Sequence, residues 1–231
     1  MNSAEPSSPS AGNSGQDRRR MAELLERLAT REGATPTPLP GVRIFRDTRV
    51  RPRSPVVYSP RIVIVAQGRK RGYLGEVAYT YDPDNYLVLS VPLPFECEIA
   101  QASAAEPFLA LAVDVDVAVL GELVLELGET APAPPVRVGV SSCPLTPELR
   151  QAAVRLLECL LSPDDSRILG PQVVREIVYR VLRGEQGPAL RALTGPHNGF
   201  AQIARALRRI HTEYPEPLDV EIGRASCRER V

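Results

Sequence analysis

Aromatic and sulfur-containing residues recur along two stretches of the chain at the spacing of β-strands. Tyrosines between residues 73 and 81 occupy odd-numbered positions, so a strand presents them on one face unless a bulge at Gly75 reverses the alternation. The stretch 95–99 alternates in the same way, and an apolar wall with a few polar tips is typical of a small-molecule pocket. The residues that we expect to line this pocket are Tyr73, Tyr79, Tyr81, Phe95, Cys97 and Ile99. The alternative is that they are ordinary core and edge residues, since aromatic side chains are enriched in strands.

The cysteines offer a second kind of chemistry. Cys97, Cys143, Cys159 and Cys227 show no paired or regular spacing, so neither a disulfide framework nor a zinc site is indicated and we expect reduced thiols. Cys97 is either a reactive sensor of electrophiles or a small buried residue. The absence of a basic neighbour in the sequence favours burial.

Metal-dependent catalysis between strands needs two or three histidines and a carboxylate. The two histidines of the chain, His197 and His211, both lie towards its carboxyl end, so we expect no metal and no cofactor in the strand-rich part. The sequence also lacks a nucleophile-elbow motif, a phosphate-binding glycine loop and a paired catalytic carboxylate motif. We therefore predict that the protein is not an enzyme.

Two basic clusters are candidates for binding anions. The segment 69–71, Arg-Lys-Arg, follows Gly68; a basic turn can hold an anion, but a solvated hairpin tip is the favoured interpretation. A second cluster forms a stripe on a helix expected after residue 199, where it either contacts nucleic-acid phosphates or faces solvent. Its members are Arg205, Arg208 and Arg209.

The overall charge limits what most of the chain can bind. The 28 basic and 28 acidic residues balance, whereas nucleic-acid binders often carry a basic excess, so most of the chain is predicted not to contact DNA. Hydrophobic residues make up 43% of the chain, which is enough for a globular core. No apolar run is long enough for a membrane span or typical of a signal peptide, and we expect a cytoplasmic protein without membrane contact.

The elements that position these residues begin with strands. Three apolar runs, Ile62–Ala66, Tyr73–Tyr81 and Leu87–Val91, are separated by turn residues at 67–72 and 82–85, which indicates an antiparallel meander. Positions 62–65 are apolar without interruption, so both faces are expected to be covered, as in a small barrel or sandwich. Further strands are expected at 42–50, 95–99 and 108–115, and another at 136–140, with a loop at 51–55.

Helices are expected on either side of the strands. Apolar residues one turn apart predict a helix from Met21, preceded by a disordered tail over residues 1–20. Asp116 and Thr146 are suitable caps for two later helices, and another helix follows Gly170. The apolar stripes of the two helices between 147 and 183 pack either inside one subunit or across a dimer axis. Residues 185–198 have the composition of a linker.

Several segments resemble one family. The sequences Y-S-P-R-I-V-I-V-A-Q-G-R-K at 58–70, L-G-E at 74–76, Y-T-Y-D-P at 79–83, Y-L-V-L-S-V-P-L-P at 86–94 and A-S-A-A-E-P-F-L-A-L at 102–111 are similar to the amino-terminal, effector-sensing domain of AraC-type transcription regulators. The match runs in order from about residue 39 to about residue 221, and 67–68 and 79–83 are its most specific parts. The resemblance implies an α+β fold, in which a cupin-like antiparallel β-barrel is followed by a helical dimerisation region and a helix-turn-helix domain that binds DNA.

The resemblance also implies how the chain is divided. Residues 21–184 correspond to the sensing and dimerisation domain, 185–198 to the linker, and 199–221 to the truncated start of the DNA-binding domain. Residues 222–231 lack an apolar period, and we interpret them as a non-native tail. The implied partners are an operator DNA, a small-molecule effector and a second copy of the chain. With only the first helix of its DNA-binding domain, the chain itself is expected to bind DNA weakly. The alternatives are a free-standing small-molecule-binding or dimerisation module and, disfavoured by the missing histidines, a cupin-type metal enzyme.

Overall fold

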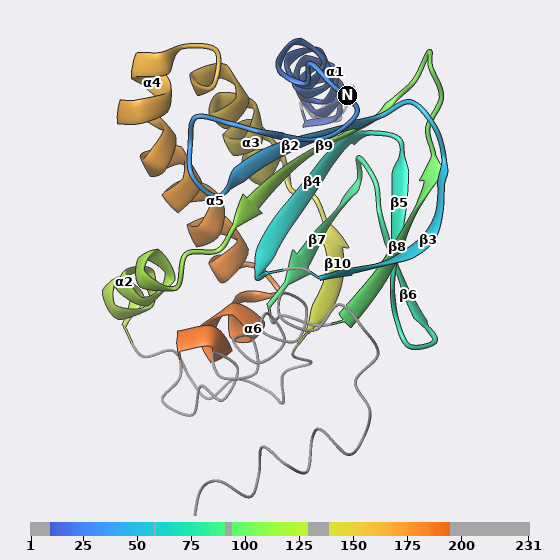
Figure 1. Ribbon diagram of the computed structural model, residues 1–231. Coiled ribbons are helices and arrows are strands. Elements are labelled where there is room, and N and C mark those ends of the chain that lie inside the picture. Colours follow the sequence, from blue (N-terminus) through green and yellow to red (C-terminus); the bar gives the residue numbers. More distant parts are fainter. Residues whose placement is uncertain (1–9, 58, 91–93, 129–138, 195–231) are drawn as a thin grey trace, which may run out of the picture.

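Two antiparallel sheets lie face to face, and helices cover the outer face of the larger one (Figure 1). A computed structural model describes residues 10–57, 59–90, 94–128 and 139–194. Within these ranges the larger sheet has the order β1 (Gly33–Pro36), β2 (Val42–Asp47), β9 (Phe108–Asp114), β4 (Arg61–Gln67), β7 (Asn85–Leu89) and β10 (Val140–Pro144). The smaller sheet has the order β3 (Arg51–Val57), β8 (Pro94–Gln101), β5 (Arg69–Leu74) and β6 (Val77–Tyr81).

The central strands of the larger sheet are buried on both faces. In β4, Ile62 and Ile64 belong to a core cluster shared with the helices, while Val63 and Val65 belong to a second cluster between the sheets. The prediction of a run covered on both sides is therefore confirmed. The predicted α+β class with antiparallel strands is also confirmed, although the two sheets form a sandwich and do not close into a barrel.

The helices pack mainly against one side of the larger sheet. They are α1 (Ser10–Leu28), α2 (Val117–Leu127), α3 (Pro147–Cys159), α4 (Pro163–Ile168), α5 (Gly170–Arg183), α6 (Gly187–Arg191) and the 3-10 turn η1 (Ala192–Thr194). The predicted caps are confirmed: Asp116 accepts a hydrogen bond from the Ala118 N–H, and Thr146 accepts one from the Leu149 N–H. The apolar stripes of α3 and α5 are buried within this one subunit, which favours the first of the two packings left open by the sequence.

Three strand predictions are wrong. The runs 62–66, 73–81 and 87–91 do not form a meander, because β4 and β7 pair in the larger sheet while β5 and β6 pair in the smaller one. The segment 51–55, predicted as a loop because of its prolines, opens β3; this strand lies at a sheet edge, where missing N–H donors are tolerated. The run 73–81 is not one strand, because Gly75 adopts a left-handed φ of 61° and turns the chain between β5 and β6. The turn predicted over 67–72 is limited to Gly68, and residues 69–72 belong to β5.

Two other boundaries also differ from the prediction. The predicted tail over 1–20 is helical from Ser10 onwards: the arginines at 18–20 favour a helix, and Arg20 pairs with Glu158 of α3 at 3.1 Å. The predicted linker over 185–198 begins with α6 and η1, which bury Leu190 and Leu193 in the helix-side core. The strand expected at 136–140 lies mostly outside the described residues, and β10 begins at Val140.

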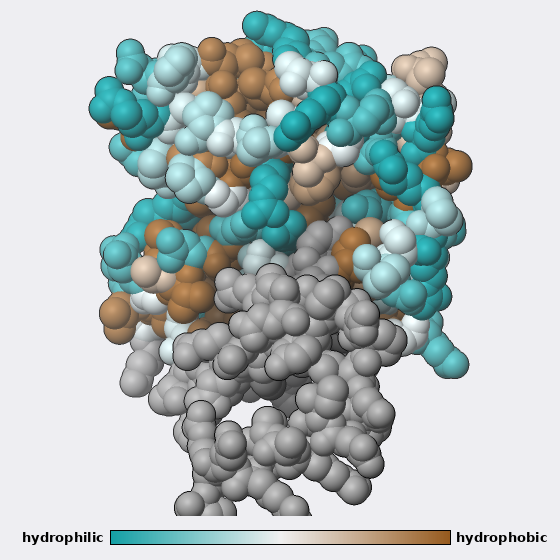
Figure 2. Space-filling model, in the orientation of Figure 1, coloured by the Kyte–Doolittle hydropathy of each residue, from teal (hydrophilic) through white to brown (hydrophobic). Residues whose placement is uncertain are grey.

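The surface carries apolar residues in small groups. Figure 2 shows hydrophobic patches separated by hydrophilic side chains, one of them over α2. On that helix Leu125 is 82% exposed.

The packing of β5 against β8 gives the first prediction. A Cβ on Gly72 would overlap the Phe95 ring in the core between the sheets, so Gly72→Ala should destabilise the protein by about 1–3 kcal/mol. Gly121, in the interior of α2, has open space around it, and Gly121→Ala should stabilise by about 0.5–1 kcal/mol. Urea unfolding followed by circular dichroism measures both. Equal effects of the two substitutions would contradict this account of Gly72.

Candidate ligand-binding site between the two sheets

A cavity of about 520 Å³ lies between the sheets, beside the edge strands β1 and β3. Most of its lining residues project from the inner faces of β2, β3, β4, β5 and β8. The described residues around it are Gly33, Ala34, Arg43, Phe45, Asp47, Arg51, Ser54, Val56, Arg61, Lys70, Cys97 and Ile99. The volume falls in the range of small-molecule sites, roughly 300–1,000 Å³.

A smaller pocket of about 10 Å³ adjoins this cavity and shares Phe45, Arg61 and Lys70 with it. Its far wall is the inner face of β9, where Ala110 and Ala112 replace the large side chains found elsewhere between the sheets. Small residues at these positions leave the space unfilled, because the spacing between neighbouring strands does not depend on the size of their side chains. The two spaces together form one site, which we call the inter-sheet cavity.

Asp114 anchors the cationic end of the site. Arg61 is only 5% exposed; its guanidinium pairs with Oδ1 of Asp114 at 3.1 Å and donates a hydrogen bond to the Ser59 hydroxyl at 2.8 Å. Arg43 pairs with the other oxygen, Oδ2, also at 3.1 Å. One carboxylate thus serves two guanidinium groups, and the group of three keeps a net positive charge.

Lys70 brings another positive charge to the site from the opposite sheet. It lies on β5, and its Nζ is 5.9 Å from the ring centroids of both Phe45 on β2 and Phe108 on β9. This distance is within the range of cation–π attraction. The side chain of Lys70 therefore reaches from the smaller sheet towards the larger one, across the inter-sheet cavity.

Five of the six predicted pocket residues lie between the sheets, and three of them line the site. Cys97 and Ile99 line the larger cavity, and Tyr81 lines the smaller pocket. Phe95 belongs to the core cluster between the sheets and Tyr79 packs against it, but neither is among the lining residues of either space.

The prediction for Tyr73 is wrong. The turn at Gly75 reverses the strand direction, so Tyr73 faces outwards, where its hydroxyl donates to Glu98 at 2.8 Å and the Arg53 guanidinium lies 4.2 Å from its ring centroid. The hydrogen bond to Glu98 raises the pKa of Tyr73 above its ordinary value.

Sequence reasoning missed Lys70 and Arg61, the two cations that line both spaces of the site. Lys70 was assigned to a solvated turn, but within β5 the alternation exposes residues 69 and 71 and turns Lys70 inwards with Gly72. Arg61 opens an apolar strand in phase with the inner-face residues Val63 and Val65. The alternation of a strand starting at residue 69 could have found Lys70. The neighbouring glycines instead favoured a turn.

Other predicted site features have separate outcomes. Cys97, Cys143 and Cys159 are buried cysteines outside any disulfide, and burial raises the pKa of the Cys143 and Cys159 thiols. The described residues contain no cluster of histidine, cysteine, aspartate and glutamate suited to a metal ion. Arg205, Arg208 and Arg209 lie outside the described residues, so their contact with DNA stays a prediction.

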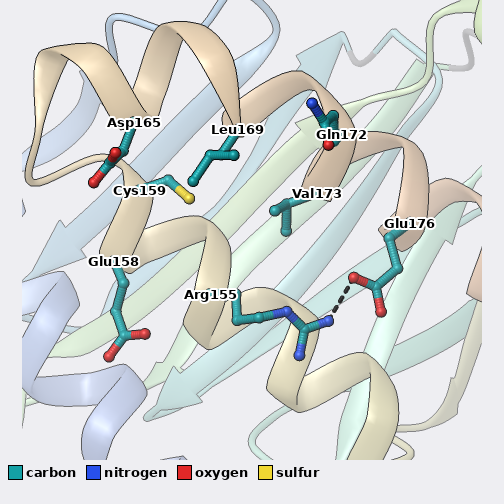
Figure 3. A pocket seen from close by; sticks show the side chains of 8 residues that line it. All are labelled: Arg155, Glu158, Cys159, Asp165, Leu169, Gln172, Val173 and Glu176. Carbon is teal, nitrogen blue, oxygen red and sulfur yellow. Dashed lines mark hydrogen bonds and ion pairs between the residues drawn. The ribbon is translucent and has the colours of Figure 1, made fainter.

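A second cavity, of about 390 Å³, lies on the helical side between α3, α4 and α5 (Figure 3). Its lining is acidic, with Glu158, Asp165 and Glu176 against Arg155. Burial disfavours the Glu176 carboxylate, but hydrogen bonds from Arg155 and Arg180 outweigh that effect and hold its pKa below its ordinary value. The Arg155–Glu176 pair ties α3 to α5, while the Arg180–Glu176 pair lies within α5, and the lining of this cavity has no aromatic residue.

The family follows from the sequence match. Residues 38–189 match the model of the AraC-type transcriptional regulator N-terminus, so the chain belongs to the AraC-type transcriptional regulators and carries their effector-sensing domain. The match begins just before β2 and ends within α6. The predicted family is therefore confirmed. None of the curated proteins compared with the chain matches it.

One solved structure supports the fold. The chain resembles an apo form of ToxT from Vibrio cholerae, with 8% identity and a TM-score of 0.56, over 86% of this chain and 72% of ToxT. This likeness supports a cupin-like sandwich. ToxT from Vibrio cholerae O395 bound to (E)-4-(8-methylnaphthalen-1-yl)but-3-enoic acid gives 8% identity and a TM-score of 0.49, over 81% of this chain and 70% of that one. The AraC-like activator CuxR gives 14% identity and a TM-score of 0.39, over 77% of this chain and 62% of CuxR.

No helix in the described ranges is long and apolar enough to cross a membrane.

The shared carboxylate at the cationic end of the site can be tested by removing its charge. Asp114→Asn leaves the buried Arg61 guanidinium beside a neutral amide, and we expect a loss of about 1–3 kcal/mol in unfolding free energy. Asp116→Asn is the matched control, because asparagine caps a helix as well as aspartate does. Urea unfolding compares the two. A loss no larger for residue 114 than for residue 116 would contradict the assigned role of Asp114.

Proposed function

We propose that this chain senses a small-molecule effector in the inter-sheet cavity and transmits the occupancy of that cavity to an AraC-type DNA-binding domain. The observation that carries the proposal is the match of residues 38–189 to the family's amino-terminal domain, since these residues include nearly all of the cavity lining. Gly33 and Ala34 are the described lining residues outside the match.

The packing suggests how occupancy is transmitted. The strands that line the cavity carry helices on their other face: Ile44 of β2 and Ile62 of β4 lie in the same core cluster as Met21 of α1 and Leu156 of α3. A ligand that shifts β2 or β4 therefore acts on the helices through close-packed side chains, which do not yield independently.

The remaining parts of the proposal concern partners. DNA is the proposed target, contacted by the residues after 194, with Arg205, Arg208 and Arg209 at phosphates. A homodimer is proposed, formed through outer surfaces of the helices between 147 and 183, since their apolar stripes are buried in the subunit. The protein is proposed to act in the cytoplasm and without catalysis.

Blocking the cavity tests the location of the effector. Ser54 is an exposed residue of β3 that lines the site, so Ser54→Trp should fill the cavity without disturbing the core, while Ser54→Ala leaves it open. Thermal shift against a metabolite panel should give hits with the wild type and with Ser54→Ala, and a saturating ligand at about a hundred times its dissociation constant adds roughly 2.7 kcal/mol. Hits that persist in Ser54→Trp would place the effector elsewhere.

DNA binding tests the second half of the proposal. Mobility shifts on promoter fragments with excess competitor DNA should give weak, salt-sensitive complexes for residues 1–231, because residues 38–189 match the sensing domain and the 28 basic residues of the chain are balanced by 28 acidic ones. Residues 1–231 joined to an AraC-type DNA-binding domain should select the operator of that domain, and the hit from the thermal screen should change that affinity. Operator-selective binding by residues 1–231 alone would contradict this division of roles.

A further inference from the structure

One side of α2 is apolar and exposed along the whole helix. Val117 is 49% exposed, and Leu125 is exposed more than any other large apolar side chain in the described ranges. A Cβ on Gly121, which lies between them, would meet no other atom. Single apolar residues are ordinary on a protein surface, but a contiguous apolar patch marks an interaction site. The residues of this patch, which we call the α2 face, are Val117, Ala118, Gly121 and Leu125.

The other sides of α2 are held in place. Leu120 and Leu123 are buried in the helix-side core. On the flank, Glu122 and Glu126 both pair with Arg175 of α5 at 2.8 Å. These contacts fix the rotation of the helix about its axis. The α2 face therefore cannot turn inwards, and a segment that covers it must come from elsewhere.

The described part of the chain ends beside α2. Both α6 and η1 contact this helix, and Leu193 of η1 lies in the same core cluster as Leu120 and Leu123. Residues 195–199 reach at most about 18 Å from Thr194 when fully extended. The 11 residues of α2 form a helix about 16 Å long. Residue 200 can therefore reach any point of the α2 face.

The sequence after residue 199 has an apolar side that needs a partner. Its apolar residues recur at the spacing of a helix, while the three arginines of the segment lie on the other sides of that helix. A helix over 200–210 has the same length as α2, and Gly121 allows its side chains to approach the α2 backbone closely. The apolar residues are Phe200, Ile203, Leu207 and Ile210.

We propose that the α2 face is the docking surface for residues 200–210 of the same chain. This assignment deepens the proposed function and rests on it, because these residues begin the part to which DNA contact is assigned. The strand β9 lines the smaller pocket with Ala110 and Ala112 and is followed directly by α2. A ligand that shifts β9 therefore moves the surface on which the DNA-binding part rests.

A disulfide between the two surfaces tests the docking. In the full 231-residue chain with Cys227→Ser, the pair Leu125→Cys and Leu207→Cys should form an intramolecular disulfide when oxidised by copper phenanthroline in air. The described native cysteines are buried and do not compete. The control replaces residue 125 by Val77, which is 55% exposed on β6, on the opposite side of the molecule from α2 (Figure 1). Val77→Cys with Leu207→Cys should stay reduced.

Hydrogen exchange measures the same contact without a cross-link. Leu125→Gln removes an apolar side chain from the α2 face, so exchange in peptides of residues 200–210 should become faster by about tenfold. Val77→Gln is the matched control and should leave exchange in these peptides unchanged. Both substitutions are at exposed positions, and thermal unfolding verifies that each variant folds.

The outcomes separate the docking from the effector site. Equal cross-linking from residues 77 and 125, or equal exchange in Leu125→Gln and Val77→Gln, would overturn the proposal. A covalent dimer in place of the intramolecular disulfide would also overturn it, because the α2 face would then receive a second copy of the chain. Neither experiment contains an effector or DNA, so a failure here leaves the thermal screen with Ser54→Trp to decide whether the inter-sheet cavity binds an effector.

Discussion

Burial of β4 and β9 on both faces is the constraint on which the rest of the structure depends. One face of these strands forms a core with α1, α3 and α5, and the other forms a core with the smaller sheet. A strand covered on both sides must be apolar at successive positions, and 62–66 and 108–113 satisfy this requirement. Close-packed interiors leave few unfilled spaces. A small or charged residue on the inner face of these strands is therefore unusual.

Two such departures define the site. Ala110 and Ala112 remove volume from the inner face of β9, and Arg61 and Asp114 add charge at the end of the same layer. Burying an ion pair contributes little to stability, because desolvation offsets most of the attraction between the charges. The family, the cavity and its charge together give one consistent account of an effector sensor.

The sequence predicts strands and helix caps correctly where a single local pattern determines the structure. The uninterrupted apolar run at 62–65, the alternation at 95–99 and the caps Asp116 and Thr146 all follow from periodicity or a single hydrogen bond. It fails at 69–75, where Gly68, Gly72 and Gly75 all suggest turns, although Gly72 is in a strand because the Phe95 ring occupies the space of its side chain. Because a change of strand boundary reverses which side chains face inwards, that error predicted Tyr73 on the inner face and left Lys70 out of the predicted site. Arg61 could not be assigned from sequence, because its counterion Asp114 is distant in the chain.

Hydrogen exchange measured by mass spectrometry, with and without a confirmed effector, tests the central claim most directly. If the effector binds in the inter-sheet cavity, protection from exchange should be greatest in peptides of β2, β3, β5 and β8, with a smaller change in α1, which follows the sheet through shared core contacts. Protection confined to α3, α4 and α5, around the acidic helical cavity, would contradict the account, because it would place the effector on the opposite side of the larger sheet.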